Sequence, residues 1–466
     1  MVRLGLAAAP AANGVRNDSS FDRLPAFGGS RSHLKICHCM AEYQPMIDRH
    51  VKPLIQESLA HFPVVTILGA RQVGKSTLAQ MISSGTWQAR YRTLDELALL
   101  DAALADPDGF VGGLELPVVL DEIQRSPELL RSIKRVVDRD RTPGRFLLTG
   151  SANLLTMQNV SETLAGRAAL LDLHPFSWAE LHRSRAPSPF LDNLFEHRNA
   201  RKFASCLPKT SSVERNELRS RILSGGYPTP SLMPAGRPRS QWFESYRRTY
   251  LERDLRQVAN VLRLPEFGRL LTAVALRTGQ LLNATAFSRD LGVPLNTIRR
   301  HLGILETTYQ VWTVPPFHVN LEKRLVKTPK LYFADTGLAC HLSGFDDWEH
   351  IERQGRAGPT VETWVASELR KIADLGAKRT EIYFWRTHAG REVDFLLARG
   401  DQLVAIEVKC AQRVTSQDIA NIMACAHDLN GRLGLAVILY SGEATVVLNE
   451  RIAAVPITTF FAGQRR

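Results

Sequence analysis

The stretch that most constrains this chain is residues 63–77, where a short β-branched apolar run leads into a glycine-rich segment and then into a predicted helix. Gly, four residues and then Gly-Lys-Ser is the pattern of a P-loop, and a preceding strand and following helix are the context this motif requires. The backbone N–H groups of such a loop and the helix N-terminus form an anion site. The stretch therefore predicts a nucleotide-binding site made of Gly69, Ala70, Arg71, Gln72, Val73, Gly74, Lys75, Ser76 and Thr77.

A second stretch, residues 116–122, completes this site. It is an apolar run that ends in Asp121 and Glu122, the arrangement called Walker B. A buried strand would carry Asp121 to the edge of the sheet, where Asp121 and Ser76 can hold Mg²⁺. Lys75 is predicted to contact the β- and γ-phosphates, and Glu122 to polarise the attacking water. ATP and Mg²⁺ are therefore the predicted cofactors.

Two further features fit an ATP site, and each has a second interpretation. Residues 145–151 form a predicted strand that ends near Thr149 and Ser151. In ATPases with an extra strand between the P-loop and Walker B strands, a polar residue here senses the γ-phosphate, but the same residues also suit a turn. Arg167 is a candidate arginine finger, which stabilises transition-state charge, and equally a candidate surface arginine.

The bulk properties describe a large, basic, ordinary globular protein. With 466 residues, a formal charge of +12 and a pI near 9.6, the chain fits about three domains and an anionic partner, DNA before a membrane surface. A basic, solvated surface explains the charge as well. The six cysteines lack paired spacing, and no apolar run reaches the roughly eighteen residues of a membrane span. We therefore expect a cytoplasmic protein with no membrane partner.

The pattern along the chain predicts an α/β multidomain protein. Residues 1–45 are expected to be a disordered extension or, alternatively, to lie upstream of a true start near Met40 or Met46. Residues 46–180 are expected to form the P-loop core, and residues 181–262 a helical lid and connector. Residues 263–330 are predicted to be a winged helix, with helices at 284–291 and 296–305 and a wing from a strand pair around 311–319. The packing residues expected between these helices are Phe287, Leu291, Val293, Ile298 and Leu302.

The second helix of this winged module carries Arg299, Arg300 and His301, at the place where a groove-reading helix contacts DNA. Winged helices also serve as protein–protein modules. Both interpretations stay open at this point.

The last segment, residues 331–466, holds a second candidate site. Asp394 lies inside the apolar strand predicted at residues 391–397, and Glu407 and Lys409 share one face of the strand at 404–409. Glu362 begins a predicted helix upstream. Two carboxylates on a divalent cation, with a lysine near the attacking water, can hydrolyse a phosphodiester. An ion-paired strand face is the alternative.

With these residues in view, the chain resembles the bacterial and archaeal AAA-type ATPases that carry a C-terminal DUF4143 domain. The resemblance runs from about Met46 to about Thr459. Its motifs are residues 69–77, 120–124, 148–151, 225–228, 250–255, 332–338, 392–395 and 406–409. The N-terminal extension and a polar insertion near residues 184–215 depart from the family pattern.

The resemblance implies an AAA-like P-loop core with a parallel sheet, a winged helix, and a C-terminal fold similar to restriction-endonuclease-like PD-(D/E)xK nucleases. Glu362, Asp394, Glu407 and Lys409 match that nuclease pattern, with Asp394 and Glu407 as the metal ligands.

Three functions follow as hypotheses. The first is an ATP-driven, DNA-associated enzyme that also cleaves DNA. The second is an ATP-switched regulatory or binding protein with a catalytically silent nuclease-like domain. The third is a signalling ATPase with a protein partner and no nucleic acid. Beside DNA, the expected partners are another protein or further copies of the same chain.

Overall fold

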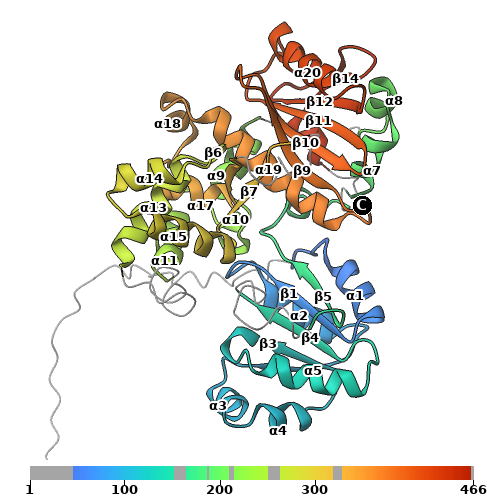
Figure 1. Cartoon of the computed structure of the whole chain (residues 1–466), viewed down its shortest axis with the longest axis vertical. Helices are drawn as coiled ribbons and strands as arrows, with labels where there is room; N and C mark the ends of the chain where they lie inside the picture. The colour runs from blue at the N-terminus through green and yellow to red at the C-terminus, as the bar shows by residue number, and fades with distance from the viewer. Residues whose placement is uncertain are drawn as a thin grey trace, which may run out of the picture. The chain divides into compact units, whose positions relative to one another are not determined.

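The computed structural model describes residues 46–151, 164–185, 188–208, 215–249, 263–318 and 328–462 (Figure 1). In these residues the strands form sheets of five, six and three strands. The extension expected over residues 1–45 and the motif at 250–255 lie outside the described residues. No helix among the described residues is long and apolar enough to cross a membrane.

The five-stranded sheet is parallel and has the order β2-β3-β4-β1-β5. Its strands are β1 (Val64–Leu68), β2 (Arg90–Thr93), β3 (Val118–Asp121), β4 (Phe146–Gly150) and β5 (Ala168–Asp172). β1, β3 and β4 are buried along their whole length, as strands covered on both faces must be. β4 lies between β1 and β3, so the predicted parallel core with its inserted strand is confirmed.

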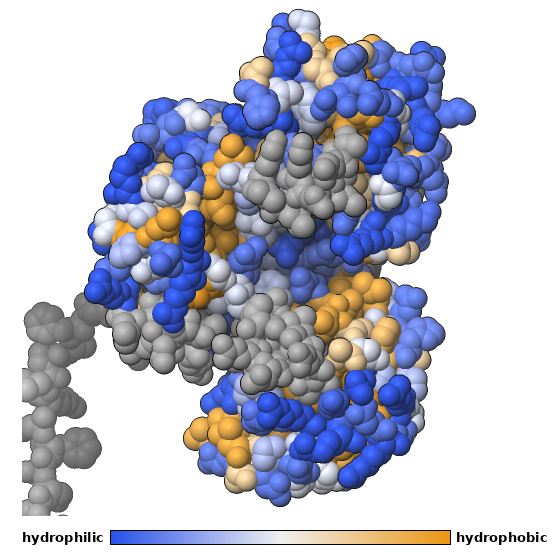
Figure 2. Space-filling model, in the orientation of Figure 1, coloured by the Kyte–Doolittle hydropathy of each residue, from blue (hydrophilic) through white to orange (hydrophobic). Residues whose placement is uncertain are grey.

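Helices cover both faces of this sheet. Val65 and Ile67 of β1 point to one face, which the first two helices cover, and Val64 and Leu68 point to the other. Figure 2 shows a hydrophobic patch over the third helix, where Leu97 is 70% exposed. The helices are α1 (Lys52–His61), α2 (Lys75–Ser83), α3 (Leu97–Ala105), α4 (Pro107–Gly112) and α5 (Leu129–Arg139), with a 3-10 turn η1 (Ile123–Arg125).

The middle of the chain folds in the order helix, strand, helix, helix, strand, strand. The elements are α13 (Leu264–Leu276), β6 (Gln280–Leu281), α14 (Ala284–Leu291), α15 (Leu295–Thr307), β7 (Val311–Val314) and β8 (Lys330–Phe333). The three strands form an antiparallel sheet with β8 in the middle. Of the expected packing residues, Leu291 is half-buried and the other four are buried.

Two expectations for this middle region are wrong. The partner of β7 is β8, not a strand within residues 311–319, so β8 crosses the domain boundary expected between residues 330 and 331. His301 is buried, with its ring 5.0 Å from the ring of Phe267. It cannot contact DNA there, because positions 298, 301, 302 and 305 form the buried stripe of α15, whereas Arg299 and Arg300 are exposed.

The six-stranded sheet lies in the C-terminal part and has the order β13-β14-β12-β11-β10-β9. Three antiparallel strands follow a long helix, and a second helix leads to β12, which is parallel to β11. The elements are α19 (Ala357–Leu375), β9 (Glu381–Arg386), β10 (Glu392–Arg399), β11 (Gln402–Lys409), α20 (Ser416–Asp428), β12 (Leu433–Tyr440), β13 (Val446–Val447), β14 (Ile452–Pro456) and α21 (Ile457–Phe461). α19 and α20 pack on opposite faces of this sheet.

Part of the expected helical lid belongs to this C-terminal domain. α7 (Ser188–Glu196) and α8 (Ala200–Ser205) lie beside the six-stranded sheet (Figure 1). Phe195 and Phe203 are buried in the same apolar cluster as Leu369 of α19. The basic residues in and around these helices suggested a connector and drew attention away from the aromatic side chains that anchor the segment.

Three segments of the chain, around residues 176, 226 and 335, pack closely at the break between α9 (Arg215–Ser224) and α10 (Pro228–Leu232). The N–H of Gly226 donates to Asp335 Oδ2 at 2.7 Å, and its carbonyl accepts from the N–H of Phe176 at 2.6 Å. Asp335 also caps a helix by accepting from Leu338. The other helices of the described residues are α6 (Trp178–Leu181), α11 (Arg237–Thr249), α17 (Thr336–Leu342) and α18 (Trp348–Arg353).

Gly337→Ala should lower the free energy of unfolding by about 1–3 kcal/mol, because overpacking strains a close backbone approach. The new Cβ would lie 2.6 Å from the nitrogen of Gly225. Gly303→Ala in α15 is the matched control: nothing lies within 4 Å of its Cβ position, and alanine in a helix stabilises by about 0.5–1 kcal/mol. Urea denaturation followed by circular dichroism measures both, and equal midpoints would contradict the close approach.

Candidate functional site

The loop between β1 and α2 has the backbone shape of an anion site. Gly69 and Gly74 have φ angles of 150° and 95°, and Gly74 caps the N-terminus of α2. A Cβ on Gly69 would lie 2.3 Å from the carbonyl oxygen of Leu173, so glycine is required there. The Lys75 ammonium donates to the carbonyls of Gly69 and Ala70 at 3.0 and 2.8 Å. The lysine is thus held across the loop that would surround a phosphate.

Asp121 is the centre of a hydroxyl cluster at the end of β3. Its carboxylate accepts from Ser76 Oγ at 3.0 Å, from Tyr91 OH at 2.7 Å and from Thr149 Oγ1. Burial and the hydrogen bond to Asp121 raise the pKa of Tyr91, so the phenol stays a donor. Ser76 and Asp121 offer hard oxygen ligands side by side, which fits Mg²⁺. The sequence did not predict that Tyr91 belongs to the site, because its position indicates only that it lies in a strand.

Glu122 follows in an uncommon backbone conformation, with a φ of 60°. Its N–H donates to Thr149 Oγ1 at 3.1 Å, and its carboxylate accepts from Gln124 Nε2, which also donates to Ser151 Oγ at 2.8 Å. A non-glycine residue in this region costs about 1–3 kcal/mol and is often found at functional sites. Thr149 therefore positions Asp121 and the backbone of Glu122 directly. Ser151 contacts the Glu122 carboxylate only through Gln124.

A cavity of about 410 Å³ joins these groups. Lys75, Ser76 and Glu122 line one side of it, together with other P-loop residues. Pro228, Thr229, Tyr246 and Thr249 line the other side. Sequence reasoning missed this second side, although the turn at residues 225–228 marks it.

Arg167 lies away from this cavity. It directly precedes β5, whose first residue, Ala168, pairs with Val64 at the start of β1, whereas the P-loop follows the end of β1. The guanidinium of Arg167 pairs with Asp138 of α5 at 2.5 Å. The structure does not bring Arg167 to the P-loop of the same chain.

The four residues expected in the C-terminal site do converge. Asp394 of β10 lies opposite Glu407 of β11, its N–H donating to Glu407 Oε2 at 3.4 Å, and its own Oδ2 accepts from the N–H of Val408 at 2.9 Å. Lys409 Nζ lies 2.8 Å from Glu407 Oε1. Glu362 of α19 reaches the same cluster through Lys330.

Five members of this cluster were missed: Lys330, Tyr332, Arg386, Glu392 and Asp418. Lys330 Nζ lies 2.8 Å from Glu362 Oε1, 2.5 Å from Glu392 Oε1 and 3.6 Å from Asp394 Oδ1. Tyr332 OH donates to Glu362 Oε1 at 2.6 Å, and Asp418 lies 3.2 Å from Lys409 Nζ. The signal for Lys330 in the sequence is weak, because it stands at the start of the apolar stretch 331–333, where a lysine is commonly exposed.

The carboxylates of this cluster outnumber its cations. Glu362, Glu392, Asp394, Glu407 and Asp418 face Lys330, Lys409 and Arg386. Burial and the charge of Asp394 raise the pKa of Glu362 to about 7 and that of Glu407 to about 8. Burial also raises the pKa of Asp394, outweighing the charge of Lys330. Buried oxygen ligands with uncompensated negative charge fit a divalent cation such as Mg²⁺ or Mn²⁺.

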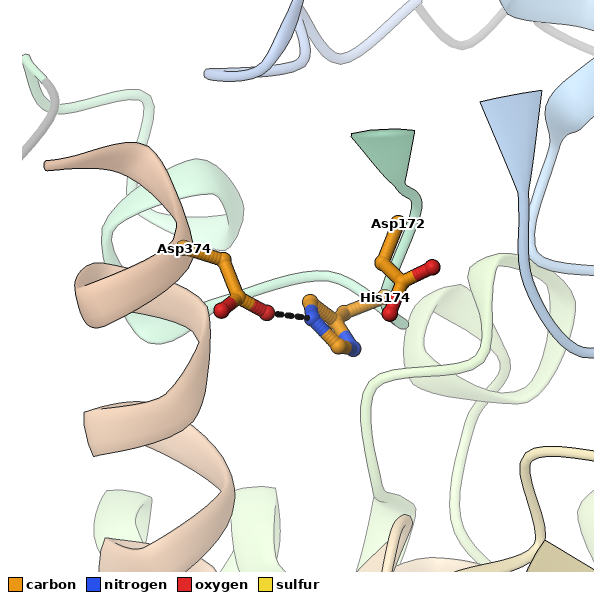
Figure 3. Close-up of side chains that lie close together, drawn as sticks. All are labelled: Asp172, His174 and Asp374. Atoms are coloured by element: carbon orange, nitrogen blue, oxygen red, sulfur yellow. Dashed lines mark hydrogen bonds and ion pairs between the residues drawn. The ribbon is translucent and has the colours of Figure 1, made fainter. Parts of the chain in front are cut away.

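A third group joins β5 to α19 (Figure 3). Ligand-type atoms of Asp172, His174 and Asp374 lie within 4.8 Å of one another. His174 Nε2 already contacts Asp374 Oδ2 at 2.6 Å, and Asp172 accepts from Tyr309 OH at 3.0 Å. Burial alone would raise the pKa of Asp374, but the hydrogen bond to His174 and the charge of Arg370 lower it. Because these groups satisfy one another, we interpret them as a polar link between elements.

Thr149→Val should lower the free energy of unfolding of the nucleotide-free chain by about 1–3 kcal/mol, because Asp121 and the N–H of Glu122 would lose a buried partner. Thr66→Val on the adjacent strand β1 is the matched control: Thr66 is equally buried, but its hydroxyl has no hydrogen-bond partner. Its replacement should leave stability unchanged or raise it. Urea denaturation compares the two, and equal losses would contradict the role given to Thr149.

Comparison with family models identifies three regions of the chain. A model of an AAA domain matches residues 61–182, and one of a domain of unknown function, DUF4143, matches residues 357–460. A further domain of unknown function, DUF8612, matches residues 215–349. The resemblance inferred from the motifs is thereby confirmed.

Two curated relatives match almost the whole chain. They are the uncharacterized proteins Rv2008c of Mycobacterium tuberculosis and Mb2031c of Mycobacterium bovis, each 30% identical over 439 residues, 94% of this chain and 90% of the relative.

Two solved structures are more distant. The RuvB Holliday junction branch migration motor of Thermotoga maritima is 19% identical with a TM-score of 0.26, covering 57% of this chain and 89% of that one. A Signal Transduction ATPase with Numerous Domains from Pyrococcus horikoshii is 11% identical with a TM-score of 0.24, covering 71% and 49%. Neither likeness is strong enough to transfer a function. The curated relatives and family models suffice to classify the chain: it belongs to the same family as the two mycobacterial proteins, and it is an AAA-type P-loop protein with a C-terminal DUF4143 domain.

Proposed function

We propose that the chain is a Mg²⁺-dependent ATP hydrolase whose C-terminal domain cleaves DNA. The observation that carries the proposal is the pair of oxygen-rich centres, one at Ser76 and Asp121 beside Lys75, the other at Asp394 and Glu407 beside Lys409. Each centre combines hard ligands for a divalent cation with a lysine that can contact a phosphate or orient water.

At the P-loop, the N–H groups of the loop and Lys75 would hold the phosphates of ATP. Ser76 and Asp121 would hold Mg²⁺, which supplies charge neutralisation at the β- and γ-phosphates when bound. Glu122 lines the same cavity and would take a proton from the attacking water. Thr149 contacts the Asp121 carboxylate and the N–H of Glu122, and Ser151 accepts from Gln124, which donates to the Glu122 carboxylate, so these contacts support a positioning role for both.

If Arg167 acts in catalysis, it acts on the ATP site of a neighbouring copy of the chain. In its own chain Arg167 lies where the strands begin, whereas the P-loop lies where β1 ends. Assembly would make ATP turnover per chain rise with protein concentration, and turnover independent of concentration would remove Arg167 from the site.

In the C-terminal domain, Asp394 and Glu407 would hold a divalent cation, which supplies Lewis-acid activation of the phosphodiester when bound. Lys409 would orient the attacking water, and hydrolysis would break a phosphorus–oxygen bond while the leaving oxygen takes a proton. The order α19, β9, β10, β11, α20, β12 supports a PD-(D/E)xK-like fold.

The middle module supports DNA as the partner. Its element order and its three-stranded sheet are those of a winged helix, which we propose it to be. Arg299 and Arg300 are exposed on α15, the helix that would face DNA. Phosphate contacts of this kind would make DNA binding fall steeply with salt.

A second candidate function is an ATP-switched binding protein with a silent C-terminal centre. One observation favours it: the Lys330 ammonium already lies 3.6 Å from Asp394, one of the two carboxylates that would hold a metal. Such a protein would bind DNA or a protein without cutting it.

The ATP site is tested by two substitutions. Lys75→Ala should weaken ATP binding roughly 10–100-fold, since a charged hydrogen-bond partner contributes about 1.5–3 kcal/mol. Glu122→Gln should keep ATP binding but slow hydrolysis by roughly 10²–10⁴-fold, because it keeps the shape and loses the base. Equilibrium titration with a fluorescent ATP analogue and a phosphate-release assay measure the two effects. Lys134→Ala on α5 is the control, and parental hydrolysis in Glu122→Gln would disprove its role.

The C-terminal centre is tested by cleavage of plasmid and linear DNA with Mg²⁺ or Mn²⁺. The parent should cut, and Glu407→Gln should reduce cutting by at least about 10²-fold, because the metal loses a charged ligand. Glu443→Gln, an exposed glutamate of the same domain, should cut like the parent. Absence of cleavage by the parent with ATP hydrolysis intact would favour the binding protein instead.

A further inference from the structure

Lys330 reaches the C-terminal centre from β8, a strand that comes before the C-terminal domain in the chain. It begins β8, the middle strand of the three-stranded sheet, and pairs with Leu281 on one side and Val314 on the other. Its side chain is only 3% exposed. Because neighbouring strands pair with β8 on both sides, the backbone at Lys330 is fixed, and this limits where the ammonium can lie.

The ammonium lies in a nest of three carboxylates. Glu392 and Glu362 are in direct contact with it, at 2.5 and 2.8 Å, and Asp394 is 3.6 Å away. Tyr332, two residues further along the same strand face, donates to the oxygen of Glu362 that Lys330 also contacts. A divalent cation bridging Glu362 and Asp394 would have to share these oxygens with a like charge at contact distance.

The other side of the cluster offers a different set of oxygens. Asp394 and Glu407 lie opposite each other on β10 and β11, whereas the carboxylates that contact Lys330 are those of Glu362, Glu392 and, at 3.6 Å, Asp394. Lys409 and Asp418 close that side. One cation between Asp394 and Glu407 would have an ammonium on each flank, Lys330 and Lys409.

We propose that the Lys330 ammonium occupies the position where a second metal ion could otherwise bind, among Glu362, Glu392 and Asp394. The centre then binds a single divalent cation, at Asp394 and Glu407. The module that precedes the C-terminal domain thus supplies a positioning residue of the centre. This inference rests on the proposed metal centre and not on the cleavage of DNA.

The test counts Mn²⁺ ions on the full chain without nucleotide, by electron paramagnetic resonance of free Mn²⁺. The parent should bind one ion that Glu407→Gln removes. Lys330→Met should bind one more ion than the parent, and Lys330→Arg, which keeps the charge, should bind the parental number. Two ions removed by Glu407→Gln in the parent, or none, would overturn the proposal, as would a parental count in Lys330→Met.

A thermal melt separates this role from that of a structural ion pair. Lys330→Met should melt lower than the parent in EDTA, because three carboxylates lose their cation, and Mn²⁺ should restore most of the loss. Arg399→Met is the matched control: the Arg399 side chain, on β10, is 7% exposed and pairs with Asp192 of α7 at 2.5 Å, outside the cluster. Its melting temperature should fall without any rescue by Mn²⁺. Equal rescue of both variants, or of neither, would overturn the proposal.

Cleavage of DNA is scored separately in the same samples. One bound Mn²⁺ without cleavage overturns the nuclease function and leaves the role of Lys330 intact. Cleavage by a parent from which Glu407→Gln removes two ions does the reverse.

Discussion

The contact on which the C-terminal half depends is the buried ammonium of Lys330 between Glu362 and Glu392. Removing one partner of a buried ion pair typically costs about 3–5 kcal/mol, because a charge is left without compensation. This requirement fixes β8 against α19 and β10, and the backbone adds to it, since the N–H of Phe317 donates to the carbonyl of Phe384 in β9 at 2.7 Å. The middle module and the C-terminal sheet therefore share one site.

The sequence predicts those parts of the fold and sites whose residues are neighbours in the chain. The P-loop is one continuous stretch, and Asp121 directly ends a buried strand, so strand direction alone brings both to one edge of the sheet. Asp394, Glu407 and Lys409 are likewise predictable, because strands β10 and β11 form a hairpin in which alternation decides the face. The burial of His301 could have been predicted in the same way from helical periodicity, but the prediction that it contacts DNA ignored the buried stripe of α15 and was wrong.

Contacts between distant segments escape such reasoning. Lys330 meets Glu392 across 62 positions of sequence, and nothing local in either strand specifies the pairing. Tyr91 reaches Asp121 only because β2 lies beside β3, and residues 188–207 pack on the C-terminal sheet through aromatic side chains within a basic stretch. Strand order and domain packing are set by the whole chain, so these members of the sites had to come from the structure.

The most direct measurement is an anomalous difference map from a crystal of the full chain with Mn²⁺ and a non-hydrolysable ATP analogue. The account predicts one manganese between Ser76 and Asp121 beside the nucleotide, and one between Asp394 and Glu407 with the Lys330 ammonium still against Glu362. A manganese in the position of Lys330, or none beside Glu407, would contradict the account of the C-terminal centre.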